Sequence, residues 1–387
     1  MSHPPTIHWL GAGLSSPAGI HYLARQEAPL TIWNRTPSRA ESIVGPVHRD
    51  GVSVRELDWD VWQESLAGGD VVVSMLPADQ HPQIAERCLE HHCHLVTASY
   101  LSKALEQLHS AAQDRGLCFV NESGLDPGLD HLFAHDAVEA LRQTPLWEDP
   151  TSRIEFASLC GGLSKTPNPF RYRFSWSPIG VLRALQTPAT LIQDSHVQST
   201  PQPWSLTEAV EIAGETFETY PNRDSLPYVK AYRLDHFTGR IDSFVRGSLR
   251  LAGWQAAWAP ILKSLPELSE TELGQLSQQL WEDHALPEGQ YDRVVLYVCL
   301  RARSAHHGEW ESHSLIDHVG DQDHSAMARL VSLPAAHAAL AVRDGRIEPG
   351  VHSTPAALAE RRALSSLLAQ EGISTTQTTS WRPWPSK

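Results

Sequence analysis

Several features are scarce or missing in this sequence of 387 residues, and each absence excludes a class of protein. No apolar run approaches the roughly 20 residues that a membrane-spanning helix needs. The first residues, MSHPPTIHW, contain no basic segment followed by an apolar one, so we expect no signal peptide. The five cysteines are irregularly spaced. So small and odd a number favours free thiols in a reducing cytoplasm over a disulfide framework.

An excess of positive charge is missing as well. The chain holds 45 Asp and Glu against 31 Lys and Arg, a formal net charge of -14. Such a charge argues against sequence-independent binding to nucleic acid or to an anionic membrane. With 41% hydrophobic and 20% charged residues, the composition is that of a folded globular protein. Its length predicts two packed units rather than one.

The first 125 residues alternate between short β-type runs and helix-type runs. We expect strands at residues 6–10, 30–33, 52–57, 71–76, 95–99 and 117–121. Helical spacing of apolar residues, together with proline in a first turn or glycine after an end, predicts helices at residues 17–25, 82–92 and 102–115. Repeated β-α units imply a parallel sheet with helices on both faces, a doubly wound α/β fold.

The pattern changes after Gly128. Helices are expected at residues 129–142, 268–284 and 325–340, and strands at 151–159, 243–251 and 294–303. Two Pro/Gly-rich tracts, residues 161–178 and 201–227, read as irregular, and the polar end of the chain is expected to be loosely ordered. These elements predict a second, mixed α/β domain.

A glycine turn follows the first predicted strand and opens the first predicted helix. Its sequence is Gly11-Ala12-Gly13-Leu14-Ser15-Ser16, the dinucleotide-binding fingerprint with serine as the last small residue. Gly11 suits the tight turn, Gly13 lets the backbone approach a pyrophosphate, and Ser16 is small enough for close packing of helix and strand. The phosphates are expected on the amides at the helix start.

The end of the second predicted strand indicates which dinucleotide is bound. NAD-preferring sites place an acidic residue here for the ribose 2′-hydroxyl. This chain has Asn34, Arg35 and Thr36 instead. An arginine with a neutral amide and a hydroxyl is suited to a 2′-phosphate. We therefore expect NADP(H) rather than NAD(H).

Two stretches of the second half are basic although the chain is acidic. Residues 161–193 hold Lys165, Arg171, Arg173 and Arg183 and no acidic residue. Residues 222–250 hold six basic residues against three aspartates. Guanidinium groups bind carboxylates well, so a substrate with several carboxylates is expected, although about half of these arginines are expected only to balance acidic patches.

The run of cysteine and histidine between Cys88 and His94 does not predict a metal site. The segment reads as the end of a helix running into a strand, so its side chains fan apart. A structural zinc site needs four converging ligands, usually with some from a second loop.

Several motifs resemble the saccharopine dehydrogenase family, in the same order along the chain. The chain is similar to that family from about residue 11 to residue 350. The motifs are DVVVSMLP (70–77), VTASY (96–100), NESGLDPGLDH (121–131), CGGL (160–163), FSWSPIGVL (174–182), YPNRDSLPY (220–228), FVRGSLRLAG (244–253) and DGRI (344–347). NRDS and FSWSP resemble the NADP-dependent, glutamate-forming branch, also called saccharopine reductase.

The resemblance implies a reductive condensation. Glutamate and 2-aminoadipate 6-semialdehyde would form an imine, and NADPH would reduce it to saccharopine; the reverse reaction oxidises saccharopine. The resemblance also implies a homodimer supported by the second domain. It implies three parts: a Rossmann NADP-binding domain at residues 1–127, a substrate and dimerisation domain at 128–322, and a C-terminal helical segment at 323–387 that returns to the Rossmann domain.

Site residues follow from the matched motifs. The candidate catalytic residues are Asp126, Tyr100 and Cys160, although Asp126 alone is typical of a turn before proline and Cys160 of a small buried residue. The candidate substrate-binding residues are Ser99, Tyr100, Asp126, Asn222, Arg223 and Arg246. The candidate cofactor-binding residues are Gly11, Gly13, Leu14, Ser15, Ser16, Asn34, Arg35, Thr36, Leu76, Pro77, Leu125 and Trp176.

Two other readings stay open. One keeps the fold and the imine reduction but changes the substrate, as in carboxynorspermidine or homospermidine synthases; the family usually has arginine where this chain has Ile179. A polyamine is a cation, so its binding site needs carboxylates or aromatic rings. The two basic stretches argue against such a substrate. The other reading is a catalytically silent NADP-binding protein.

Overall fold

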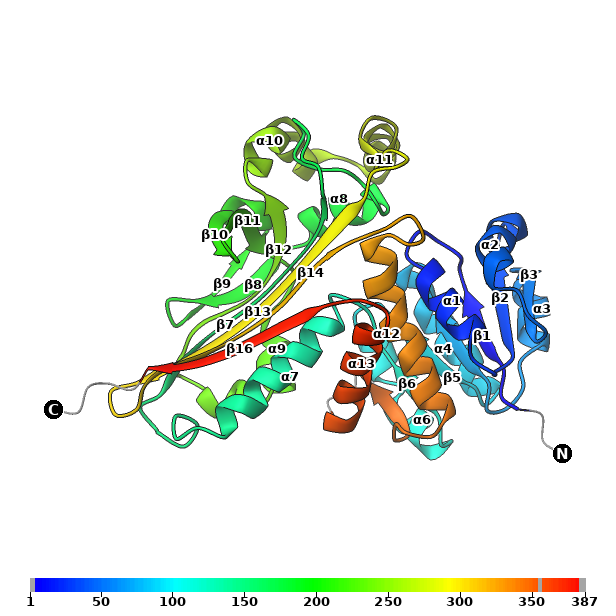
Figure 1. The fold of residues 1–387 in the computed structure, drawn as a ribbon, viewed down its shortest axis with the longest axis horizontal. Helices are drawn as coiled ribbons and strands as arrows, with labels where there is room; N and C mark the ends of the chain where they lie inside the picture. The colour runs from blue at the N-terminus through cyan, green and yellow to red at the C-terminus, as the bar shows by residue number, and fades with distance from the viewer. Residues whose placement is uncertain (1–3, 354–356, 383–387) are drawn as a thin grey trace. The chain divides into compact units, whose positions relative to one another are not determined.

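The computed structural model describes residues 4–353 and 357–382. Within these residues the chain forms two compact units (Figure 1). The first runs to Leu132 and includes Met327–Gly372; the second comprises Phe133–Ala326 and the residues from Ile373 onward. No helix of this described part combines the length and the apolar character needed to cross a membrane.

A parallel seven-stranded sheet forms the centre of the first unit. Its strand order is β15-β6-β5-β4-β1-β2-β3. The strands are β1 (Ile7–Leu10), β2 (Leu30–Asn34), β3 (Val52–Glu56), β4 (Val71–Ser74), β5 (His94–Thr97), β6 (Cys118–Val120) and β15 (Gly350–His352). Every residue of β1 and β4 is buried, as expected for strands covered on both faces. The predicted doubly wound α/β fold is confirmed.

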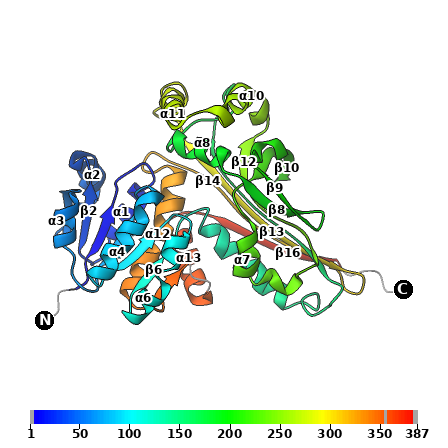
Figure 2. The ribbon, with the colours of Figure 1, turned by 180° about the vertical axis from the view of Figure 1, so that it is seen from behind.

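Helices cover both faces of this sheet. On one face, the core is shared with α1 (Pro17–Ala24), α2 (Pro37–Val44) and α12 (Ala326–Arg343). On the other, it is shared with α3 (Trp59–Glu64), α4 (His81–Glu90), α5 (Lys103–Glu106) and α6 (His109–Asp114), and Figure 2 shows α4 and α6 from that side. The unit also contains α13 (Leu358–Gln370) and the 3-10 helices η1 (Gly45–Val47) and η2 (Ala78–Gln80).

The second unit is built on a mixed nine-stranded sheet. The main order is β10-β11-β12-β7-β13-β14-β16, and β8 joins β12 to β9. Of these pairs only β7 with β12 is parallel. The strands are β7 (Arg153–Ser164), β8 (Ala189–Gln193), β9 (His196–Thr200), β10 (Glu208–Ile212), β11 (Glu215–Pro221), β12 (Ile241–Leu251), β13 (Asp292–Ser304), β14 (Gly308–Val319) and β16 (Thr375–Arg382).

Three of the helices of the second unit share an aromatic core. Trp254 and Trp258 are completely buried there with Tyr172 and Phe174. The helices are α7 (Leu129–Arg142), which leads into the unit, α8 (Pro178–Gln186), α9 (Leu226–Ala231), α10 (Trp254–Ser264) and α11 (Glu270–His284), with η3 (Pro203–Leu206), η4 (Leu234–Phe237) and η5 (Leu265–Glu267). A capping box of Ser269 and Glu272 begins α11, the predicted acidic helix.

Some local expectations were wrong. The helix expected at residues 102–115 is broken into α5 and α6, because Leu108 N–H bonds to Leu105 O and tightens the turn between them. The tract 201–227 contains the hairpin β10–β11 rather than only irregular chain.

The last described residues also differ from expectation. The segment 323–387 was expected to return as a whole to the Rossmann domain, and its end was expected to be loosely ordered. The structure divides it: α12 and α13 lie in the first unit, whereas β16 pairs with β14 in the second sheet. All eight residues of β16 are exposed, so this edge strand lacks the apolar alternation that reveals a strand.

We predict that Gly19→Ala destabilises the first unit. A Cβ at Gly19 would lie 2.5 Å from Ser332 O and 2.8 Å from the Trp9 ring, at the contact of α1 with α12. Such overpacking should cost about 1–3 kcal/mol of unfolding free energy in a urea titration. Gly274→Ala is the matched control, because a Cβ on this glycine of α11 meets nothing within 4 Å. It should stabilise by about 0.5–1 kcal/mol. Equal effects of the two changes would contradict the packing argument.

Candidate functional site

The glycine turn after β1 requires glycine at its first position. Gly11 has φ +94°, and its N–H donates to Trp33 O at 2.8 Å. A Cβ here would lie 3.0 Å from Leu76 Cδ2 at the end of β4. Both the backbone conformation and the approach of Leu76 therefore exclude a side chain.

The turn presents amides at the start of α1. Ala12 N–H donates to Asn34 Oδ1 at 3.0 Å, and Ser16 N–H to Gly13 O. Within the described residues, the amides of residues 13–15 have no hydrogen-bond partner. A Cβ at Gly13 would meet nothing within 4 Å, so packing does not require this glycine. Unpaired donors at the start of an eight-residue helix fit an anionic phosphate.

Ser16 is buried at the start of α1, and a second small residue of this helix, Gly19, also makes a close contact. Ser16 is the N-cap residue of α1, and its hydroxyl donates to Gly11 O at 2.9 Å. Close approach of α1 occurs at Gly19, whose N–H donates to Ser332 Oγ at 2.7 Å. Sequence reasoning missed Gly19 because its neighbour, Ser332, is more than 300 residues away in the chain.

The three candidate residues at the end of β2, Asn34, Arg35 and Thr36, differ in whether their side chains are available to bind a ligand. The Asn34 side chain is engaged within the chain, since its Nδ2 also donates to Thr36 O at 2.8 Å. Arg35 and Thr36 are exposed. Arg35 therefore stays the candidate for a 2′-phosphate, while Asn34 holds the glycine turn. Leu76 and Pro77 follow β4, where His81 Nε2 donates to Leu76 O at 3.1 Å; burial lowers the pKa of His81.

The candidate catalytic pair of the first unit lies at the carboxyl ends of β5 and β6. Tyr100 OH donates to Asp126 Oδ1 at 3.1 Å. Ser99 precedes Tyr100, and its carbonyl accepts the Glu122 N–H at 2.9 Å. Leu125, beside Asp126, is buried. Ligands bind at the carboxyl edge of open parallel sheets, so this is a suitable place for chemistry.

A buried group of Glu122, Asp130 and His131 lies next to this pair. Each of their side chains is at most 4% exposed, and His131 Nε2 lies 3.0 Å from Glu122 Oε2. The motif NESGLDPGLDH contained all three, but from this motif the sequence singled out only Leu125 and Asp126.

The candidate substrate residues of the second unit share neighbouring strands. Arg246 of β12 pairs with Ser158 of β7, and two positions on, Ser248 pairs with Cys160. These residues therefore share one face of the sheet. Asn222, after β11, donates its N–H to Arg246 O at 2.8 Å.

The two candidate arginine clamps differ in exposure. Arg223 is exposed and has φ +59°. Arg246 is only 2% exposed, and its guanidinium lies 4.0 Å from the centre of the Tyr228 ring. Trp176, the cofactor candidate of this unit, is partly buried against Gly180 and donates to Tyr172 OH at 3.4 Å.

Several arginines of the basic stretches have structural contacts. Arg183 pairs with Glu270 at 2.9 Å, and Arg240 donates to backbone carbonyls. Arg250 is buried, donates to Tyr220 OH at 2.5 Å and lies over the Tyr220 ring at 5.2 Å. Burial raises the pKa of Tyr220, and the charge of Arg250 opposes that rise. The composition of these stretches therefore overstates the number of cations available to a ligand.

The fold and the glycine turn define a dinucleotide-binding Rossmann protein with a separate mixed-sheet domain. Residues 7–120 match the saccharopine dehydrogenase NADP binding domain, and residues 124–373 match the saccharopine dehydrogenase C-terminal domain. The chain belongs to the saccharopine dehydrogenase family, and its N-terminal domain is the family's NADP-binding domain.

Related proteins match parts of the chain. The mitochondrial alpha-aminoadipic semialdehyde synthase of Bos taurus is 32% identical over 264 residues, which cover 66% of this chain but 27% of that protein. The saccharopine dehydrogenase [NADP(+), L-glutamate-forming] of Pyricularia oryzae is 32% identical over 287 residues, covering 72% of this chain and 61% of the relative. The matches thus span only part of each relative.

Solved structures share the fold. Apo saccharopine dehydrogenase (L-Glu forming) from Saccharomyces cerevisiae has a TM-score of 0.79 at 24% identity and covers 97% of this chain and 100% of its own. Homospermidine synthase from Legionella pneumophila, in complex with NAD, has a TM-score of 0.64 at 11% identity and covers 99% of this chain and 92% of its own.

We predict that Arg35→Ala weakens NADPH binding selectively. Loss of one charge-assisted contact should raise the Kd for NADPH about tenfold to hundredfold in calorimetric titrations. The Kd for NADH should change little, because NADH lacks the 2′-phosphate. Arg25→Ala is the control: Arg25 follows the opposite end of α1 and pairs with Glu371 at 2.7 Å. Equal weakening of NADPH and NADH would remove Arg35 from the 2′-phosphate site.

Proposed function

We propose that this protein is an NADP(H)-dependent oxidoreductase of CH–NH bonds with the activity of glutamate-forming saccharopine dehydrogenase. In the reductive direction, the amine of glutamate condenses with the aldehyde of 2-aminoadipate 6-semialdehyde and releases water. The resulting imine then takes up a hydride and a proton to give saccharopine. NADPH, when bound, supplies the hydride. The function belongs to lysine metabolism.

One observation carries this proposal. The hydrogen-bonded pair Tyr100 and Asp126 lies at the carboxyl edge of the same parallel sheet that carries the glycine turn. A hydride donor on the turn and a proton-transfer pair at one edge are what the reduction of a C=N bond needs.

The pair suits proton transfer to nitrogen. We assign Tyr100 the role of the acid, because its hydroxyl carries a proton that it can donate. Its hydrogen bond to Asp126 orients the Tyr100 hydroxyl. The Asp126 carboxylate either accepts a proton from the substrate amine or binds that amine. Ser99 contributes a further polar contact, and Cys160 is retained as a candidate from the second unit.

Recognition of the substrate carboxylates is assigned to the second unit. Arg223 is exposed with a guanidinium suited to bidentate binding. Asn222 precedes it in the chain and donates its N–H to the carbonyl of Arg246, in the middle of β12. By this proposal, residues 1–127 bind the cofactor and residues 128–322 bind the substrate. Residues 323–387 form the C-terminal segment and are assigned no ligand.

The function is tested directly with purified protein. Saccharopine and NADP+ should give an increase in absorbance from reduced cofactor, and NAD+ should give a much smaller one. Turnover of a polyamine-derived secondary amine in place of saccharopine would favour a homospermidine-synthase-like activity. NADP(H) binding without any turnover would indicate a silent cofactor-binding protein.

We predict that Arg223→Lys raises the KM for saccharopine. Lysine keeps the charge but loses the two-pronged hydrogen bonding, so KM should rise about tenfold. The Kd for NADP+ should stay unchanged. Arg183→Lys is the control, since Arg183 pairs with Glu270 on the surface. An unchanged KM for saccharopine in Arg223→Lys would remove Arg223 from the substrate site.

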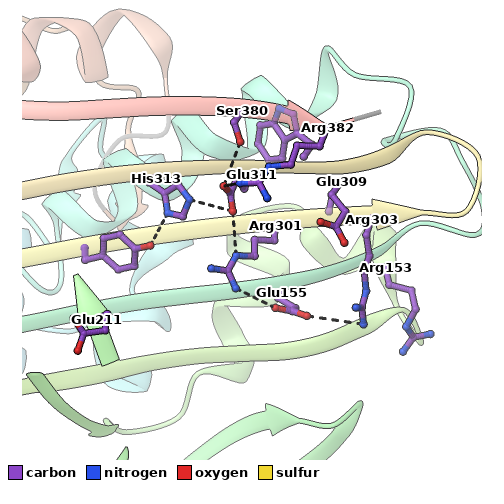
Figure 3. A pocket seen from close by; sticks show the side chains of 13 residues that line it. Arg153, Glu155, Glu211, Arg301, Arg303, Glu309, Glu311, His313, Ser380 and Arg382 are labelled. Atoms are coloured by element: carbon purple, nitrogen blue, oxygen red, sulfur yellow. Dashed lines mark hydrogen bonds and ion pairs between the residues drawn. The ribbon is translucent and has the colours of Figure 1, made fainter. Parts of the chain in front are cut away.

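We propose that the partner of this chain is a second copy of itself, and that the homodimer forms through the second sheet. One face of this sheet has a hollow of about 610 Å³ lined by charged side chains from β7, β13, β14 and β16 (Figure 3). Glu155 lies between Arg301 and Arg303, at 3.8 and 4.0 Å, and Glu311 lies 3.4 Å from Arg301. Rows of both signs on one face are self-complementary about a two-fold axis.

We predict that Arg301→Glu shifts the chain from dimer to monomer in light-scattering measurements. The change removes the cation that pairs with Glu155 and Glu311 and makes this patch of the assigned interface strongly acidic. A two-fold axis would bring the same acidic patch of the second copy against it, and like charges across an interface cost several kcal/mol of association free energy. Arg183→Glu, on α8, should leave the mass unchanged. A monomeric wild-type chain would refute the dimer outright.

The cytoplasm is the location we assign. All five cysteines lie within the described residues, are buried and form no disulfide. Free thiols are typical of a reducing compartment.

A further inference from the structure

We infer that Glu122, His131 and Asp130 form a positioning group that sets the geometry of Tyr100 and Asp126. This inference rests on the proposed function, because it assigns the group to the reaction of that pair. It is carried by contacts that lie entirely within the first unit.

His131 lies between two carboxylates. Its Nε2 is 3.0 Å from Glu122 Oε2, and its Nδ1 is 3.5 Å from Asp130 Oδ2. The side chains of His131, Glu122 and Asp130 are 3%, 4% and 0% exposed. The imidazole therefore lies between two buried carboxylates, away from water.

Each carboxylate also holds a piece of backbone beside a candidate catalytic residue. Glu122 Oε1 accepts the N–H of Leu101, the residue after Tyr100, at 3.0 Å. Asp130 Oδ1 accepts the N–H of Gly128, two residues after Asp126, at 2.6 Å. Through His131, the segment that carries Tyr100 is thus joined to the turn that carries Asp126.

The backbone around the group is constrained as well. Glu122 has φ +57°, which is uncommon for a residue other than glycine. Gly128 has φ +145°, and a Cβ there would lie 2.0 Å from Gly124 O. Such conformations persist only where the surroundings enforce them, and they concentrate at functional sites.

Stability alone is a poor reason to keep this group. Removing ionisable side chains from water is costly, and well-packed apolar residues often serve a core equally well. A connected set of short polar contacts does provide fixed geometry. A proton-transfer pair needs that geometry, because small displacements of reacting groups reduce the rate strongly.

The first unit offers a matched control. His8 and Asp70 are also an imidazole and a carboxylate, 3.1 Å apart with side chains 3% and 6% exposed. Their other hydrogen bonds go to Thr6, Ala67 and the Trp33 indole. None of these residues belongs to the candidate catalytic pair.

The first readout is kinetic. His131→Gln should lower kcat for saccharopine oxidation about tenfold to hundredfold, as expected for displaced catalytic groups. The KM for NADP+ should stay within about twofold, because the glycine turn is untouched. His8→Gln should lower the melting temperature while leaving kcat within about twofold, because it removes core contacts only. Equal kcat values for the two variants would overturn the inference.

The second readout does not depend on activity. Hydrogen–deuterium exchange of the amides of Leu101 and Gly128 should accelerate about tenfold in His131→Gln and not in His8→Gln, because only the first change loosens their acceptors. Unchanged exchange at both amides overturns the inference. Glu122→Gln serves for both readouts should His131→Gln fail to fold. A wild-type protein that does not oxidise saccharopine refutes the proposed function, and the exchange result still decides the positioning group.

Discussion

The first unit depends on one constraint, the burial of a parallel sheet on both faces. Helices cover both faces of the sheet, and every residue of β1 and β4 is buried, so the ends of these strands are where a ligand can reach them. All strands run in the same direction, so the residues after β1, β5 and β6 reach a common edge. Gly11, Tyr100 and Asp126 therefore come from distant parts of the sequence to the same edge. The proposed hydride and proton transfers both rely on this arrangement.

Buried polar groups of the first unit serve two different purposes. His8 and Asp70 connect β1 to the turn before β4 inside the core. Glu122, His131 and Asp130 are equally buried, but their hydrogen bonds end on backbone beside Tyr100 and Asp126. The distances and the burial of the two groups are nearly the same. The groups differ in which backbone amides their carboxylates bind. Asn34, which is only half-buried, differs from both groups: its amide lies next to the expected ribose site and holds the glycine turn.

The arginines of the second unit show why composition is an incomplete guide to ligand binding. Arg183 balances Glu270, Arg240 satisfies backbone carbonyls, and Arg250 is enclosed by aromatic rings. These roles remove three cations from the pool that a carboxylate-rich substrate could use. Arg223 is exposed, and Arg246 packs under Tyr228 beside it in the fold. The two stretches are basic in composition, but several of their arginines make contacts within the fold and are not available to a ligand.

Local signals of periodicity and residue type were enough to predict six strands of the Rossmann unit, the glycine turn and the motifs of the family. The sequence predicted α7 at its observed bounds and the strands β12 and β13 to within two residues. It missed β15 and β16, which become strands only by pairing with β6 and β14. It also missed the roles of Gly19 and His131. Gly19 matters because Ser332 packs against it, and His131 because folding places it between two carboxylates. Such features become visible in the folded chain, because they arise from contacts between residues that no local pattern relates.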